Sequence, residues 1–172
     1  MQKHFAMFAS YNQWANRRLY ACAAALSDAD YRAGRGAFFG SVHATLNHLV
    51  LTDRIWMQRF TGEGPTYPQL DTILYEDLAD LREAREAEDA RIIAWVDGLD
   101  SERLAGYFTY RTIVQPREMT QPLAPALAHF FNHQTHHRGQ AHGLLTAIGG
   151  RAAAVSLDLL LFQRDTGVGL SA

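Results

Sequence analysis

The chain has 172 residues, of which 48% are hydrophobic, enough for one domain with a continuous core. Its formal net charge of -2, with Lys and Arg scattered among acids, argues against a nucleic-acid-binding surface. The one cysteine, Cys22, excludes an internal disulfide and a cysteine-rich zinc site, and fits a reducing cytoplasm. No apolar run reaches about 18 residues, which argues against a membrane span, and residues 1–10 do not resemble a signal peptide. We expect a single cytoplasmic domain over 1–172.

The first half of the chain shows two amphipathic segments. Apolar residues at three-and-four spacing predict a helix over 3–26, with Asn12 standing in its apolar stripe. Residues 27–40 contain three glycines and are expected to form a loop. A second helix is predicted over 41–60, beginning at a serine suited to capping, with Asp53 in the middle of its stripe.

The second half adds two further helices and an extended segment. Residues 71–97, dense in Ala, Leu, Glu and Arg, predict a third helix, with Leu74 among its buried residues. Aromatic and β-branched residues over 104–120 favour a short hairpin, and a fourth helix is predicted over 122–148. Residues 156–165 are expected to add a helical turn or two over one end. Four long helices around one core predict an all-α four-helix bundle.

Histidines are concentrated on the fourth predicted helix, which carries five of the eight. At about 100° per residue, His137 lies within about 30° of the centre of the apolar face and His133 within about 70°. His129 and His136 point about 100° or more away, and His142 points to the far side. Residues at i and i+4 share one helix face, so His133 and His137 form an inward-facing pair that could grip a metal ion.

A metal ion needs at least a third ligand, and the alternative is a pair of core histidines hydrogen-bonded to their neighbours. The second helix offers His43 and His48, which flank its apolar stripe on opposite sides. Periodicity does not choose between the two. His48 lies nearer the middle of the helix, at the right height to meet His133 and His137.

Polar residues interrupt several apolar stripes near mid-helix and predict a polar layer around the site. Asp53 and Glu88 are candidates to accept the second ring N–H of a metal-bound histidine, and Glu88 is also a candidate fourth ligand. Asn12 belongs to the same level. The competing interpretation for Glu88 is a surface pair with Arg85 at helical spacing.

Three phrases carry a resemblance to a known family: YNQWAN in the first helix, LNHLVLTDRIW in the second and NHQTHHRGQ in the fourth. Together they resemble the DinB family, which is related to metal-dependent thiol S-transferases and mycothiol-dependent maleylpyruvate isomerase. The resemblance implies a four-helix bundle with up-down-down-up connectivity, often a homodimer, and a three-histidine metal site. The ligands map onto His48, His133 and His137, and His129 and His136 become neighbours of the site.

Three neutral imidazoles leave an open coordination position, the layout of a catalytic site. Zn²⁺ and Ni²⁺ both suit imidazole. The resemblance favours S-transfer from a low-molecular-weight thiol to a small electrophile, and Arg117 and Arg138 are candidates to bind a substrate carboxylate. The alternatives are a metal-dependent hydrolase, a non-catalytic metal-binding stress-response module, and a purely structural metal. We expect a small-molecule substrate and neither nucleic acid nor membrane as a partner, and no catalytic residue is assigned.

Overall fold

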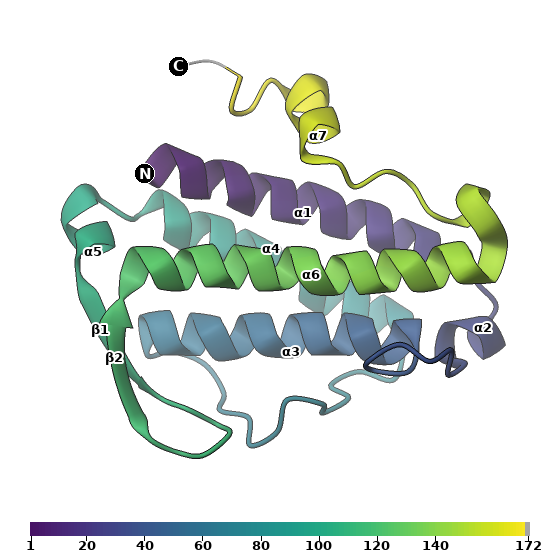
Figure 1. Cartoon of the computed structure of the whole chain (residues 1–172), viewed down its shortest axis with the longest axis horizontal. Helices are drawn as coiled ribbons and strands as arrows, with labels where there is room; N and C mark the ends of the chain where they lie inside the picture. The colour runs from purple at the N-terminus through teal and green to yellow at the C-terminus, as the bar shows by residue number, and fades with distance from the viewer. Residues whose placement is uncertain (171–172) are drawn as a thin grey trace.

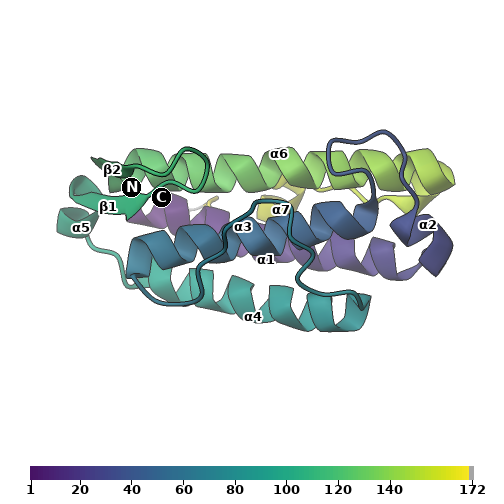
Figure 2. The same cartoon turned by 90° about the horizontal axis from the view of Figure 1, so that it is seen from below.

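The structure, a computed structural model of the chain, describes residues 1–170. Within these residues, no helix combines the length and apolar character that crossing a membrane requires. The fold is mostly helical, with one small two-stranded sheet (Figure 1). The four long helices are α1 (Gln2–Ala24), α3 (Val42–Thr61), α4 (Leu78–Asp97) and α6 (Leu123–Gly149). They lie side by side, with α1 and α3 each contacting both α4 and α6 (Figure 2). The prediction of four long helices is confirmed.

The ends of α3 follow from local chemistry. The Ser41 hydroxyl accepts a hydrogen bond from the Ala44 amide, as expected of an N-cap. At the other end, Gly62 adopts φ 76°, a left-handed conformation that glycine reaches without steric cost, and its N–H is donated to the Gln58 carbonyl. The two ends fix α3 at Val42–Thr61, so the helix continues well beyond His43 and His48.

The third predicted helix begins later than expected. Residues 71–77 are not helical, and α4 starts only after Asp77, whose carboxylate accepts hydrogen bonds from two amides of the first turn. Residues 62–77 instead form a loop that runs back along α3 (Figures 1 and 2). Leu74, expected on a helix face, lies in this loop. The physical reason is an external partner: the Asn47 amide oxygen accepts the Leu74 and Tyr75 N–H groups, which removes the need for helical partners.

Two other segments also differ from the expected outline. The predicted loop over 27–40 contains a short helix, α2 (Asp28–Arg32), capped by Ser27. The C-terminal helix α7 (Leu159–Thr166) exists, but it packs against the flank of α1 rather than over one end. Its Phe162 contacts the Tyr11 and Trp14 rings, with ring centroids 5.8 Å apart in both cases. The aromatic surface that Tyr11 and Trp14 form on α1 therefore determines where α7 packs.

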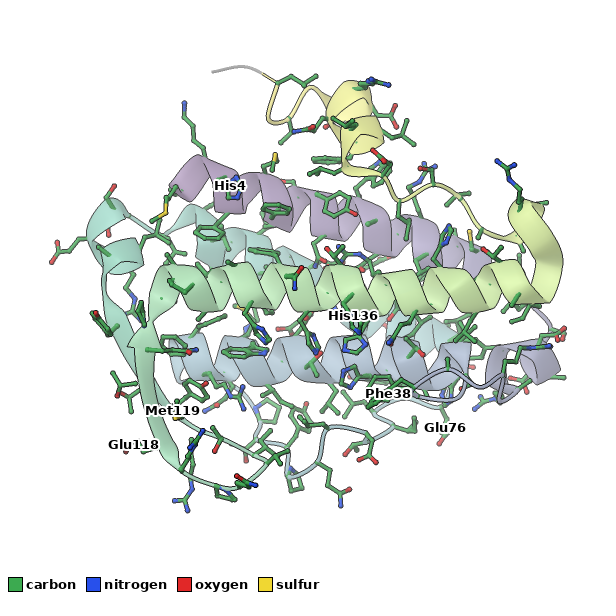
Figure 3. The ribbon with its side chains drawn as sticks, in the orientation of Figure 1. His4, Phe38, Glu76, Glu118, Met119 and His136 are labelled. Atoms are coloured by element: carbon green, nitrogen blue, oxygen red, sulfur yellow. The ribbon has the colours of Figure 1, made fainter. Side chains whose placement is uncertain are left out.

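The predicted hairpin between the third and fourth long helices is confirmed. After a short helix α5 (Ser101–Ala105), strand β1 (Tyr107–Arg111) pairs antiparallel with β2 (Glu118–Pro122). The two strands and their turn extend away from the helices, and Glu118 and Met119 lie at their outer edge (Figure 3). A single 3-10 turn, η1 (Gly150–Ala153), follows α6.

Two large apolar clusters of the core are separated by polar side chains, and a third, smaller cluster of Tyr11, Ala15 and Phe162 lies between α1 and α7. On each long helix, apolar residues of one cluster come first, buried polar residues follow, and residues of the other cluster come last. The buried polar residues at this level are Asn12, Asn16, Asp53, Arg85, Glu88, Asp89, Gln134 and Arg138. The predicted polar layer at mid-helix height therefore exists.

Candidate metal centre

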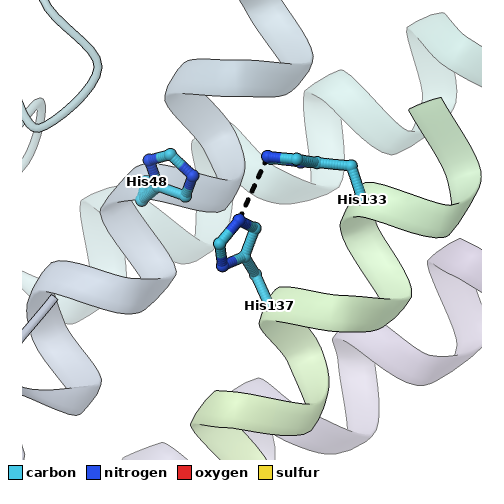
Figure 4. A group of neighbouring side chains, drawn as sticks. All are labelled: His48, His133 and His137. Atoms are coloured by element: carbon cyan, nitrogen blue, oxygen red, sulfur yellow. Dashed lines mark hydrogen bonds between the residues drawn. The ribbon is translucent and has the colours of Figure 1, made fainter. Parts of the chain in front are cut away.

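Three histidines from two helices meet at one point. His48 comes from α3, and His133 and His137 come from successive turns of α6 (Figure 4). One ring nitrogen from each lies within 4.8 Å of the others, and the Nε2 atoms of His133 and His137 are 3.1 Å apart. The i, i+4 spacing on α6 aims both rings toward α3, which packs directly against α6.

Hydrogen bonds at the far sides of the rings decide which nitrogens face inward. His48 Nδ1 lies 2.7 Å from the Leu70 carbonyl oxygen, so it carries the hydrogen and donates it. His137 Nδ1 lies 2.8 Å from Oε1 of Gln140 and donates in the same way. The Nε2 atoms of both rings are then left with lone pairs, and both turn toward His133. His48 Nε2 is buried and has no hydrogen-bond partner among residues 1–170.

The surroundings keep these imidazoles neutral. Burial lowers the pKa of His48 to about 4, and burial together with the neighbouring His137 and His48 lowers the pKa of His133 to about 3. Burial also lowers the pKa of His137. A neutral imidazole is the form that binds a metal ion.

The geometry can be tested against a metal ion. With metal–nitrogen distances of about 2.1 Å, ligands at a tetrahedral centre lie about 3.4 Å apart. The Nε2 atoms of His133 and His137, 3.1 Å apart, are close to this spacing. The ligand atoms of the three histidines all lie within 4.8 Å of one another, so small ring rotations would bring them to the tetrahedral spacing. A buried lone pair without a donor is costly, and a cation between the three rings would remove that cost at His48. The three residues fit a divalent ion.

The loop before α3 forms one wall of the site. Phe39 stacks on His48 with ring centroids 3.9 Å apart and lies 5.3 Å from the His137 ring. The neighbouring Phe38 is 81% exposed, and in Figure 3 it lies below His136, which projects from α6 on the same side. The His136 ring contacts that of His137 at 4.8 Å. An aromatic wall on one side restricts the directions from which a small molecule can reach the histidines.

The choice between His43 and His48, open from periodicity, is resolved by the loop over 62–77. Both histidines donate a ring N–H to backbone carbonyls of this loop, but at different points along it. His43 Nε2 lies 3.0 Å from the Tyr75 carbonyl, away from the α6 histidines. His48 is bonded to Leu70 and faces them.

Asn12 and Asp53, predicted to lie beside the histidines, make their side-chain hydrogen bonds to other residues of the described chain. The carboxylate of Asp53 accepts from Arg85 and Gln134, and Asn12 bonds to Asp89 and Arg138. These bonds bind the four helices to one another, in what we call the buried ion network: Asn12, Asn16, Asp53, Arg85, Asp89, Gln134 and Arg138.

Glu88 does not join the histidines either. It accepts from Arg91 and lies 3.7 Å from Arg54, and in residues 1–170 it makes no hydrogen bond to the three rings. Arg85 pairs with Asp53 and Asp89 rather than with Glu88, so the expected surface pair is also absent from the described residues. The ring N–H acceptors are a backbone carbonyl and Gln140. Arg85 is only 2% exposed, and the carboxylates of Asp53 and Asp89 pair with it because a buried charge needs compensation.

Three further candidates are placed as follows. His129 is a neighbour of the site, with its ring 5.8 Å from that of His133 and 5.2 Å from that of Trp56, and this ring makes no hydrogen bond within residues 1–170. Arg138 is buried in the ion network and Arg117 lies in the hairpin turn, so neither faces the histidines.

Sequence reasoning missed three contributors to the site. Gln140 lies three residues after His137 on α6, a helical neighbour that spacing alone could have identified. Phe39 and the Leu70 carbonyl come from loops, and no periodic signal marks them.

Comparisons with known proteins identify the family of the chain. A model of the DinB family matches residues 1–166. Protein DinB of Bacillus subtilis (strain 168) is 25% identical over 170 residues, which cover 91% of this chain and 92% of that protein. No solved structure matches the chain significantly. Because the family model spans nearly the whole sequence, including the three histidines, the chain belongs to the DinB family.

Proposed function

We propose that this chain is a metal-dependent enzyme that binds one divalent cation through His48, His133 and His137. The observation that carries the proposal is the buried Nε2 of His48, which has no hydrogen-bond partner among residues 1–170 and faces two further Nε2 atoms that are 3.1 Å apart. Zn²⁺ and Ni²⁺ are the proposed ions because both favour imidazole nitrogen. Three protein ligands leave a further position for a substrate atom.

The proposed reaction is S-transfer from a low-molecular-weight thiol to a small electrophile. A bound cation would lower the pKa of a thiol or a water molecule in the open position. In the transfer, sulfur forms a bond to an electrophilic carbon, the leaving group departs with its electron pair, and the thiol proton passes to a base. His129 is the proposed acceptor because its ring lies 5.8 Å from that of His133 and is neutral, since burial and the nearby Arg59 lower its pKa. DinB family membership and the neutral histidine group support the metal site, and the resemblance to thiol transferases supports the reaction.

The same three nitrogens would also serve a hydrolase, in which water takes the place of the thiol. A non-catalytic metal-binding module of a stress response would bind the ion without turnover. These two alternatives are outcomes of the experiment below.

The remaining features of the proposal concern the whole molecule. We propose that residues 1–172 form one domain, a four-helix bundle with up-down-down-up connectivity, supported by the mutual contacts of α1, α3, α4 and α6. A homodimer in the cytoplasm is proposed from the family resemblance and from the lone cysteine. The formal net charge of -2 supports a small-molecule substrate rather than nucleic acid, and no membrane partner is proposed.

Elemental analysis tests the metal site. Protein purified without a histidine tag should contain about one Zn²⁺ or Ni²⁺ per chain, and His48→Ala should contain none. His142→Ala is the matched control, because His142 lies on α6 but bonds to the Val155 carbonyl instead of joining the cluster. Absence of stoichiometric metal from the unmodified protein would overturn the proposal.

Turnover tests the reaction. Cysteine and a chloronitroaromatic electrophile are mixed with the metal-loaded protein, and loss of free thiol is followed against the His137→Ala variant. Thiol consumption that disappears in the variant supports transfer. Ester hydrolysis without thiol consumption would favour the hydrolase, and bound metal with neither activity would favour the module.

A further inference from the structure

A pocket of about 560 Å³ lies beside α3, between the loop over 62–77 and strand β1. It contains none of the three histidines. Two arginines and two tyrosines contribute to its lining, and in the described residues no aspartate or glutamate does. Its volume is in the range of sites that hold small organic ligands, about 300–1,000 Å³. Its charge is therefore positive, in a chain whose overall charge is negative.

The central residue of the pocket is Arg59, which α3 presents from its last turn. Its guanidinium carbon lies 4.6 Å from the ring centroid of Trp56 and 4.6 Å from that of Tyr110, and these two rings contact each other at 5.7 Å, so the guanidinium rests against an aromatic pair. It is half-buried, and among residues 1–170 it has neither a hydrogen bond nor a carboxylate within 4.0 Å. The two aromatic contacts restrain the guanidinium, and its N–H groups have no hydrogen-bond acceptor among the described residues.

Other arginines of comparable burial have partners. Arg54 donates to the Tyr75 hydroxyl and lies near Glu88, and Arg91 donates to Glu88 and to backbone oxygen. A half-buried cation that is oriented but unpaired has the properties of an anion-binding group, because a planar fork of N–H donors matches a carboxylate. Arg111, exposed on β1, lines the same pocket and adds a second positive charge.

The rest of the lining suits a flat apolar body. Ile55 and Pro68 contribute aliphatic surface, and the rings of Tyr67 and Tyr110 contribute aromatic faces with hydroxyl groups at their edges. A ligand that placed an anionic group on Arg59 would rest its apolar part against these side chains.

We infer that this pocket binds a small organic anion, with a carboxylate on Arg59 and a flat apolar body against Ile55 and Tyr110. The pocket shares a face of α3 with the metal centre, since Ile55 and Arg59 follow His48 by seven and eleven residues, each within about 20° of its direction. Pro68 lines the pocket two residues before Leu70, whose carbonyl accepts from His48.

The pocket would therefore recognise the anionic end of the electrophilic substrate, a role that rests on the enzyme function proposed above. Ile55 lies about 10 Å along the helix axis from His48, a span that one extended small molecule can cover. The anion site itself does not depend on the metal.

Isothermal titration calorimetry of the metal-depleted full chain tests the anion site, with 2-naphthoate as the probe and 2-naphthamide as its neutral counterpart. We expect naphthoate to bind at least about tenfold more tightly than the amide, because a charge-assisted hydrogen bond is lost in the amide. Arg59→Gln should remove this preference, and Arg164→Gln, an equal charge change on exposed α7, should keep it.

Arg111→Gln is the second variant, used if Arg59→Gln fails to fold, and it should weaken naphthoate but not the amide. Equal binding of acid and amide, absence of naphthoate binding, or unchanged selectivity in the folded Arg59→Gln variant would each overturn the inference. Repeating the titration with His137→Ala separates the two proposals, because naphthoate binding should persist there even though the metal is lost.

Discussion

Two polar groups lie in the helical interior, and they differ in how their charges are balanced. The buried ion network combines two arginines, Arg85 and Arg138, with two carboxylates, Asp53 and Asp89, so its formal charge sums to zero. The histidine cluster places three imidazoles together and no carboxylate bonds to them within residues 1–170. The network balances its own charges, although several of its buried polar atoms have no hydrogen-bond partner within residues 1–170. The cluster has no balancing charge, and its ring nitrogens converge from two helices. Converging lone pairs without a carboxylate beside them mark the candidate cation site.

The largest expected effect comes from breaking the network. Arg85→Ala leaves two buried carboxylates without their cation and should lower the free energy of unfolding by about 3–5 kcal/mol. Urea denaturation measures the loss. The control Arg82→Ala removes an exposed pair with Glu86 and should cost less than about 1 kcal/mol. A loss below that of the control would mean that the network does not stabilise the fold.

Acidification should act on the cluster. The folded pKa of His48, about 4, lies below its unfolded value of about 6.5, so the unfolded chain binds more protons between these pH values. The stability of the metal-free protein due to His48 is therefore present above pH 6.5 and lost as the pH falls toward 4, by up to about 3 kcal/mol.

Urea denaturation at several pH values measures this loss, and His48→Gln is the comparison. Burial raises the pKa of Asp53 and Asp89, which acts in the opposite direction, so the difference between the two proteins isolates the imidazole. Identical pH slopes in the two proteins would contradict the assignment.

Metal addition should stabilise the protein through the cluster alone. At a free Zn²⁺ concentration one hundred times the dissociation constant, the gain in unfolding free energy should be about 2.7 kcal/mol. His133→Ala should show no gain. A folded variant of the network, such as Gln134→Ala, should keep the gain, because the two regions share no hydrogen bond in residues 1–170. Thermal melts with and without a chelator report the difference, and stabilisation of His133→Ala would place the ion elsewhere.

The smallest and sharpest test uses one glutamine from each region. Gln140 accepts from His137 Nδ1, so Gln140→Ala should weaken Zn²⁺ binding by about tenfold with little loss of stability. Gln134 donates to Asp53, so Gln134→Ala should cost about 1–2 kcal/mol of stability and leave the metal affinity unchanged. Competition with a chelating dye and urea denaturation provide the two readouts. If Gln140→Ala lost stability and Gln134→Ala lost metal affinity, the roles assigned to the two regions would be wrong.

Helical periodicity predicted the long helices and the inward pair His133 and His137, because a helix face is a local property of the sequence. The polar layer was predicted for the same reason. The hydrogen bonds within the layer were not predicted. Asp53 was expected to accept from a histidine, but it accepts from Arg85, which comes from another helix. Pairing across helices depends on their rotation about their own axes, which the hydrophobic pattern fixes only approximately.

The loops were the least predictable part of the site. The composition of residues 71–77 predicted the start of a helix. Instead, the whole segment 62–77 is a loop that hydrogen bonds to Asn47 and His48 hold against α3. These contacts join residues more than twenty positions apart, and no periodic pattern in the sequence indicates them. The same loop accepts hydrogen bonds from both His43 and His48, and His48 is the one whose ring lies against His137 on α6.

The attachment of this loop at Asn47 has an evolutionary consequence. One amide side chain fixes residues 74 and 75, and the chain from Gly62 to Leu70 passes over the pocket without belonging to any regular element. Substitutions among the pocket-lining residues 65–68 would alter the pocket while the helices, the three histidines and the Leu70 carbonyl kept their positions. Relatives could therefore diverge in what they recognise by changing a single surface segment on an unaltered metal scaffold.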